Sequence, residues 1–239
     1  MDNAYYTTLS RQSGLMRQMQ SVANNIANMS TTGFRREGII FSEYVHDTGP
    51  AQKSLSMAGS QARHVDLDQG TLDQTGGQFD FAIDGPGFFL IDTPEGERLT
   101  RAGHFTPNEQ GDLVTPDGYL VLDAGGAPVF VPPDTRSIAM SADGTLSADG
   151  RPIGQLGVWQ PVDPKTLEHQ AGTRFSAGEV EPVIEGTRIR QGFLEDSNVN
   201  PVSEITRMIE VSRAYELGQS FLEKEDERIR AVVSTLGRQ

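Results

Sequence analysis

The sequence predicts an α+β fold, in which long N- and C-terminal helices pack together in a coiled-coil-like manner and a mostly-β central domain is inserted between them. Two observations support this prediction. None of the 13 prolines lies in residues 1–49 or 202–239, whereas 21 of the 26 glycines lie in residues 39–200. Proline and glycine interrupt helices and mark turns, so the ends of the chain favour helices and the middle favours short strands.

The N-terminal segment has helical periodicity. Two interleaved series of apolar or small residues, each with a step of seven, consist of Leu9, Met16 and Ala23 and of Met19 and Ile26. This spacing predicts an amphipathic helix. Asn3 is suited to cap its start, and the run from Asn28 to Gly33 is expected to end it. Residues 1–34 are therefore assigned to a terminal helical domain.

Residues 35–78 are expected to form an extended connector, because much of this segment is rich in Ser, Gln, Gly and Asp. Residues 79–199 are expected to form a β-rich domain, since short apolar runs alternate there with turn signals such as Asp143-Gly144. The candidate strands are Phe79–Ile83, Phe88–Ile91, Tyr119–Leu122, Leu156–Trp159 and Arg188–Leu194. Their spacing favours a sandwich or an irregular barrel.

The C-terminal segment predicts a second and longer helix. Asn200 suits the N-cap and Pro201 the first helical position. A heptad series then runs without a break through Met208, Tyr215, Leu222, Ile229 and Leu236, and Ile205 widens its apolar face. Residues 200–239 therefore complete the helical domain of residues 1–34. A helix of this length presents more apolar surface than a β domain of modest size can cover, which indicates assembly with other chains.

Composition and charge exclude several classes of function. The net charge is −13, with −14 carried by residues 39–196, so nucleic acid is not an expected partner. No apolar run reaches the ~20 residues that span a bilayer, so no membrane span is expected. There are no cysteines, which excludes disulfides and thiolate chemistry. Met1–Ser10 lack a basic patch followed by an apolar stretch, so no cleaved signal peptide is expected.

The search for catalytic, cofactor-binding and metal-binding residues identifies none. The four histidines share no helical turn, and no phosphate-binding loop or EF-hand spacing is present. Asp66 and Asp68 alternate, but such pairs are common by chance in an acidic chain. The protein is therefore not expected to be an enzyme, and no cofactor is expected. A carboxylate enzyme acting on glycans is kept as a distant alternative.

Several short motifs resemble those of the bacterial flagellar basal-body rod and hook proteins. The motifs occur in family order over nearly the whole chain: Ala23–Asn28 and Thr32–Arg35, Asp68–Leu72, Thr75–Gly77, Phe81–Phe89, Thr100–Phe105, Gly111–Val114, Gly118-Tyr119, Ser197–Val202, Met208-Ile209 and Arg213–Glu216. Each motif alone is weak evidence, and together they are strong. Within the family, Met1–Thr7 is similar to the opening of a proximal-rod member.

This resemblance implies a structural subunit of the proximal rod that self-assembles on a helical lattice through its terminal helices and transmits torque. It implies copies of itself and other rod proteins as partners, and export through the flagellar type III apparatus to the periplasmic rod of the basal body. Two alternatives stay open: another axial protein such as the distal rod, and a secreted β-domain binding module on a helical stalk.

The expected assembly interface combines the heptad series of both terminal segments with two amides of the N-terminal helix, Asn24 and Asn28. Its residues are Leu9, Met16, Met19, Ala23, Asn24, Ile26, Asn28, Ile205, Met208, Tyr215, Leu222, Ile229 and Leu236. Buried amides in a tightly packed tube must be paired, which would fix the register of neighbouring subunits. Gly33, Phe34, Gly85 and Gly87 are expected at turns and connections, with Gly33 at positive φ.

Overall fold

The computed structural model describes residues 2–46, 55–183 and 186–236, so Met1 and the residues 47–54, 184–185 and 237–239 of the expected domains lie outside the described residues. The chain folds into two compact units. Unit 1 is formed by residues 1–27, 37–64 and 200–239, and unit 2 by residues 28–36 and 65–199. Each unit therefore combines segments that are far apart in sequence.

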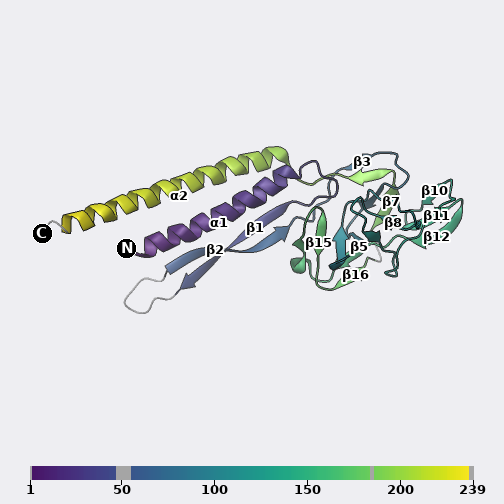
Figure 1. Ribbon diagram of the computed structural model, residues 1–239, viewed down its shortest axis with the longest axis horizontal. Coiled ribbons are helices and arrows are strands. Elements are labelled where there is room, and N and C mark those ends of the chain that lie inside the picture. The colour runs from purple at the N-terminus through teal and green to yellow at the C-terminus, as the bar shows by residue number, and fades with distance from the viewer. Residues whose placement is uncertain (1, 47–54, 184–185, 237–239) are drawn as a thin grey trace. The chain divides into compact units, whose positions relative to one another are not determined.

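Two long helices, α1 (Asp2–Ala27) and α2 (Pro201–Leu236), lie side by side in unit 1 (Figure 1). Both terminal helices and their packing against each other are as the sequence predicts. Asn200 caps α2, because its Oδ1 accepts a hydrogen bond of 3.1 Å from the backbone nitrogen of Ser203. None of the helices among the described residues is long and apolar enough to cross a membrane.

The segment expected as a connector contains regular structure. β1 (Glu37–His46) and β2 (Leu55–Val65) pair as a two-stranded sheet, and α1 packs against β1. Figure 1 shows α1 between this sheet and α2. Residues 66–71, which follow β2 and belong to unit 2, have no strand structure.

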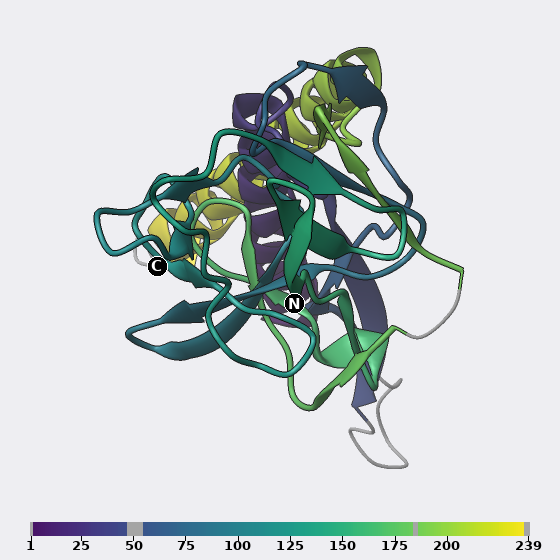
Figure 2. The ribbon, with the colours of Figure 1, turned by 90° about the vertical axis from the view of Figure 1, so that its right-hand side faces the viewer.

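Unit 2 is mostly β, as expected, and Figures 1 and 2 show its strands from two directions. The strands are β3 (Leu72–Gln74), β4 (Phe81–Asp84), β5 (Phe89–Thr93), β6 (Gly96–Thr100), β7 (Thr106–Pro107), β8 (Leu113–Val114), β9 (Leu120–Val121), β10 (Ile138–Met140), β11 (Thr145–Ala148), β12 (Arg151–Gln155), β13 (Trp159–Pro161), β14 (Glu168–His169), β15 (Arg174–Ser176), β16 (Val180–Pro182), β17 (Arg188–Gln191) and β18 (Phe193–Glu195). A short 3-10 helix, η1 (Pro164–Thr166), lies between β13 and β14.

The largest sheet of unit 2 has the order β14-β15-β6-β5-β9-β8-β7, and all its neighbours are antiparallel. β10-β11-β12 form a second sheet, and β13-β16, β17-β4 and β18-β3 form pairs. The central strand β5 is buried on both faces: Phe89 and Ile91 belong to one apolar cluster and Leu90 to another. The alternation of side chains across a strand explains this division.

Candidate assembly surface

The contact between α1 and α2 includes a close approach at Gly218. The side chain of Gln12 donates a hydrogen bond of 2.8 Å from its Nε2 to the backbone oxygen of Tyr215. A Cβ atom on Gly218 would lie only 2.3 Å from that Nε2. Gly218 therefore lets the Gln12 side chain reach the backbone of α2, and Val22 and Val211 are buried residues of the same two helices.

Asn25 joins three elements of unit 1. Its Nδ2 donates hydrogen bonds to the backbone oxygen of Glu37 in β1 at 2.8 Å and to Oε2 of Glu204 in α2 at 3.1 Å. Its Oδ1 accepts a hydrogen bond of 2.9 Å from the backbone nitrogen of Glu37. Asn25, Glu37 and Glu204 are all buried. The Asn25 side chain therefore pairs both backbone groups of Glu37, as a neighbouring strand would. The same side chain also bonds to Glu204 and so links α1 to α2.

Both helices expose large apolar side chains. Among the described residues of α2, only Glu204 and Val211 are buried. The exposed apolar residues of α2 are Val202, Ile205, Ile209, Leu217, Phe221, Ile229, Val232, Val233 and Leu236, and those of α1 include Leu9 and Met16. A groove of about 410 Å³ also runs between the helices, lined by Thr8, Arg11, Gln12, Leu15, Ala214, Leu217, Gly218 and Phe221. Apolar faces of this extent are typical of contacts with other proteins.

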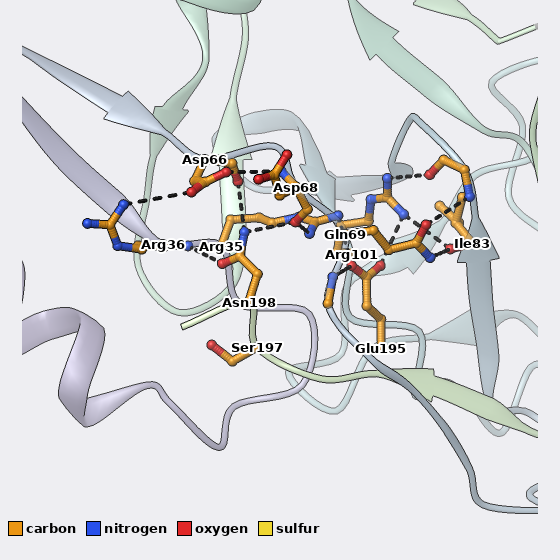
Figure 3. Close-up of polar contacts among 12 residues, drawn as sticks. Arg35, Arg36, Asp66, Asp68, Gln69, Ile83, Arg101, Glu195, Ser197 and Asn198 are labelled. Atoms are coloured by element: carbon orange, nitrogen blue, oxygen red, sulfur yellow. Dashed lines mark hydrogen bonds and ion pairs between the residues drawn. The ribbon is translucent and has the colours of Figure 1, made fainter. Parts of the chain in front are cut away.

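A buried ion cluster joins four segments of unit 2 (Figure 3). The carboxylate of Glu195, at the end of β18, forms ion pairs with two arginines. Its Oε1 lies 2.8 Å from Nη2 of Arg35, and its Oε2 lies 3.0 Å from Nη1 of Arg101. It also accepts a hydrogen bond of 2.9 Å from the backbone nitrogen of Gly70. All three charged side chains are almost fully buried, so each depends on the others for its charge to be tolerated.

Other donors of the two guanidinium groups bind backbone carbonyls, whereas the buried Nε atoms of Arg35 and Arg101 have no hydrogen-bond partner among the described residues. Arg101 donates to the oxygens of Gly85 at 2.7 Å and Ile83 at 3.3 Å, and Arg35 donates to the oxygen of Asp68. Burial lowers the pKa of Arg101 to about 10, and the Glu195 carboxylate opposes that shift. Burial likewise lowers the pKa of Arg35. The cluster therefore joins strand ends and loops of unit 2 through charge that has little access to water.

Asn198 makes a second junction beside this cluster (Figure 3). Its Nδ2 donates to the backbone oxygens of Asp66 at 3.1 Å and Asp68 at 2.8 Å, and its Oδ1 accepts from the backbone nitrogen of Arg36 at 2.7 Å. Three segments, residues 34–36, 66–70 and 195–198, are thus fixed to one another within unit 2.

The structure distributes the interface residues predicted from the sequence along both helices rather than in one pocket. Six of them are exposed: Leu9, Met16, Ala23, Ile205, Ile229 and Leu236. The other seven are partly buried: Met19, Asn24, Ile26, Asn28, Met208, Tyr215 and Leu222. Asn28 lies in the turn after α1, where its backbone oxygen accepts a hydrogen bond of 3.1 Å from the backbone nitrogen of Thr31.

The predicted turn residues lie in unit 2. Gly33 has a φ of +73°, and a Cβ atom there would lie 2.3 Å from the backbone nitrogen of Ala102. Gly85 and Gly87 have φ values of +121° and +108°, and Phe34 is fully buried. The positive φ values of the three glycines are backbone conformations that favour glycine over other residues.

Sequence reasoning missed the buried polar residues. Periodicity does not identify Gln12 and Glu204, because a polar residue within an apolar seam interrupts the pattern that is being sought. Asn25 lies inside the Ala23–Asn28 motif, but the predicted interface contains Asn24 and Asn28 and not Asn25. Arg35 and Arg101 each lie two positions from a glycine inside a quoted motif, and that is the signal that they occupy constrained positions.

Three models of flagellar proteins match the chain. A model described as "Flagella basal body rod protein" matches residues 6–35, and one described as "Flagellar hook protein FlgE/F/G D1 domain" matches residues 82–148. A third, "Flagellar basal body rod FlgEFG protein C-terminal", matches residues 190–235. The matched regions thus include most of α1, a large part of unit 2 and nearly all of α2.

Curated relatives match over almost their whole length. The flagellar basal-body rod protein FlgF of Mesorhizobium japonicum is 39% identical, with 99% of each chain covered. FlgF of Caulobacter vibrioides is 38% identical over 100% of this chain and 99% of its own. The rod protein FlgG of Bacillus subtilis is 31% identical over 98% of this chain and 99% of its own.

Proposed function

Because the chain belongs to the flagellar basal-body rod protein family, we propose that it builds the rod through the exposed faces of α1 and α2, which pack against copies of itself and other rod proteins on a helical lattice. The protein is a structural subunit of the flagellar basal body and not an enzyme.

The observation that carries the proposal is the exposure of α2. The helix has 36 residues, yet only two of them are buried within the chain. Burying apolar surface is favourable by ~25 cal/mol per Å², so exposed faces of this length supply a large driving force for association. The acidic charge lies mostly in residues 39–196, where like charge discourages sideways aggregation of the assembled subunits.

The two polar junctions suit a part that transmits torque. In unit 1 the Asn25 side chain ties α1 to β1 and α2, and in unit 2 Glu195 ties three segments through buried charge. Buried hydrogen bonds and ion pairs resist displacement, because breaking them leaves unsatisfied groups away from water. These contacts support a role for each unit as a stiff body under load.

We further propose a proximal position in the rod, a periplasmic location, and export through the flagellar type III apparatus without a cleaved signal peptide. Two observations support the proximal position over a distal one: the opening Met1–Thr7 resembles that of the proximal-rod member of the family, which is FlgF, and relatives named FlgF are 36–39% identical to the chain. Labelling the subunit in isolated basal bodies tests the position directly. Cleavage of the amino terminus in the mature protein, read by mass spectrometry, would contradict the export route.

The double substitution Leu222→Asp/Ile229→Asp tests the assembly role of α2. We expect the variant to be absent from isolated basal bodies and the cells to be non-motile, because two charges interrupt the apolar face. The β-rich unit 2 should stay folded, since neither residue belongs to it. The variant Gln219→Asp/Ser234→Asp adds the same charge at exposed polar positions of α2 and should assemble. Normal swimming by the first variant would refute the proposal.

A further inference from the structure

Residues 195–198, which we call the latch, bind two segments of unit 2 that stand far earlier in the chain. The backbone nitrogen of Gly33 donates a hydrogen bond of 2.7 Å to the backbone oxygen of Glu195. The backbone nitrogen of Asp196 donates one of 2.9 Å to the backbone oxygen of Thr71. Because these bonds add to the side-chain contacts of the latch (Figure 3), both earlier segments are fixed to it through backbone and side chains.

The two larger sheets of unit 2 take no strand from the latch. Every strand of the seven-stranded sheet lies between Phe89 and Ser176, and β10, β11 and β12 lie in the same range. Most members of the two apolar clusters also come from this range. Among the described residues, Ile189 is the one buried member of either cluster that follows Ser176. The sheets and most of their core therefore consist of residues that precede the latch.

The binding site of the latch depends on those sheets. Arg101 directly follows β6, the strand that pairs with both β5 and β15. The sheet therefore positions the Arg101 guanidinium, which lies 3.0 Å from the Glu195 carboxylate. Joining segments so far apart in sequence closes a long loop, and the contacts at the closure offset its entropic cost only once they form. We therefore expect the latch to bind after the sheets have formed.

Charge makes this closure depend on Glu195. The side chains of Arg35 and Arg101 are only 1% and 3% exposed, and both lie within 3.0 Å of the Glu195 carboxylate. If residues 33–36 docked before the latch, both cations would be buried without their shared buried anion. Removing one partner from a buried charge network is strongly destabilising. The docked position of residues 33–36 is therefore favourable only when Glu195 is present.

We propose that the latch closes unit 2 last, so that residues 33–36 and 66–71 stay undocked until residues 195–198 reach the finished sheets. A chain that emerges amino terminus first, from a ribosome or from a channel, has to release Glu195 before this step. Premature closure of unit 2 around a partly emerged chain is thereby prevented. The value of this order during export rests on the proposed function, whereas the order itself is a property of the chain alone.

Pulse-labelling hydrogen exchange during refolding of the purified full chain tests the order. The denatured chain is diluted into refolding buffer, labelled briefly at increasing times, digested and read by mass spectrometry. We expect peptides from residues 89–100, which include β5 and β6, to gain protection in an early phase. Peptides covering residues 33–36 and 195–198 should gain protection together, in a phase several-fold slower. A single common phase, or protection of the latch before the sheets, would overturn the proposal.

The substitution Glu195→Gln tests the role of the charge, because it keeps the size of the side chain. In the folded variant we expect residues 33–36 to lose protection from exchange by about tenfold or more, while residues 89–100 stay protected. Glu95→Gln is the matched control, since Glu95 is an exposed acid 3.6 Å from Arg98, and it should leave residues 33–36 protected.

Two results of this substitution would contradict the latch. Equal loss of protection in residues 33–36 and 89–100 would show that the latch and the sheets form one cooperative unit. Unchanged protection of residues 33–36 would show that their docking does not need the Glu195 charge. Neither result bears on assembly through α1 and α2, which is measured separately by incorporation of the Leu222→Asp/Ile229→Asp variant into basal bodies.

Discussion

Asn25 donates a hydrogen bond of 3.1 Å to the carboxylate of Glu204, and both side chains are buried between α1 and α2. The same amide pairs both backbone groups of Glu37 in β1. A buried polar group is stabilising only while its partners are present. Asn25 therefore links three elements of unit 1 through buried hydrogen bonds, so its loss removes partners of Glu37 and Glu204 together.

Replacing Asn25 by Leu should lower the free energy of unfolding by about 2 kcal/mol or more, because Glu37 and Glu204 lose buried hydrogen bonds. Denaturant unfolding followed by helical circular dichroism measures the effect. Gln20→Leu removes an exposed amide from the same helix and should change stability by less than about 0.5 kcal/mol. Equal effects of the two substitutions would show that the Asn25 junction does not stabilise the helix pair.

Gly33→Ala should destabilise unit 2 by clearly more than Gly172→Ala. Both glycines have a φ of +73°, so both alanines incur about 1 kcal/mol of backbone strain. Only at Gly33 would the added methyl group meet the backbone, at 2.3 Å from the nitrogen of Ala102, whereas nothing lies within 4 Å at Gly172. Thermal unfolding monitored by the fluorescence of Trp159 compares the two variants, and equal losses would contradict the steric argument.

Glu195→Gln should lower the stability of unit 2 by about 3–5 kcal/mol, because Arg35 and Arg101 then lack their shared buried anion. Glu95→Gln is the matched control. Glu95 approaches Arg98 at 3.6 Å but is 76% exposed, so its loss should cost at most about 1 kcal/mol. Denaturant titrations of both variants measure the difference. A small effect of Glu195→Gln would mean that the guanidinium groups find other partners.

The sequence predicts the elements whose signal is local. α2 begins at Pro201, and the adjacent residues Asn200 and Pro201 predict this start because they are typical of the N-cap and first helical positions. The strand expected over Arg188–Leu194 is instead two strands, β17 and β18, since Gly192 adopts a φ of +76° and turns the chain between them. A single glycine in an apolar run signals such a break only weakly.

The junctions could not be predicted, because their members are far apart in sequence. Arg35 and Glu195 are separated by 160 positions, and nothing in the local pattern of either residue indicates the other. Periodicity identifies apolar faces, so it found the exposed stripes that begin at Leu9 and end at Leu236. Periodicity does not identify buried charges, because their positions depend on how distant loops meet.

Asp73→Asn should stabilise unit 2 at neutral pH and have little effect below pH 3.8. The pKa of Asp196 is raised above its ordinary 3.8, mainly by burial and further by Asp73 beside it. A raised pKa favours the protonated carboxyl in the folded state, so this contribution to stability is complete below 3.8 and is lost as pH rises through the folded pKa. Denaturation across pH measures the profile, and Asp134→Asn controls for the loss of one exposed acid.

Limited proteolysis should distinguish the free end of α2 from the part that α1 covers. In the purified chain we expect trypsin to cleave first after Arg228 and Arg230, which lie on the exposed end, and later after Arg207, which is partly buried. Cleavage requires local unfolding, which is easiest where a helix has fewest tertiary contacts. In isolated basal bodies the early cleavages should disappear, because neighbouring subunits cover that end. Equally fast cleavage at all three arginines would mean that α2 leaves α1 readily in the free subunit, and the ordering of both helices would then belong to assembly itself.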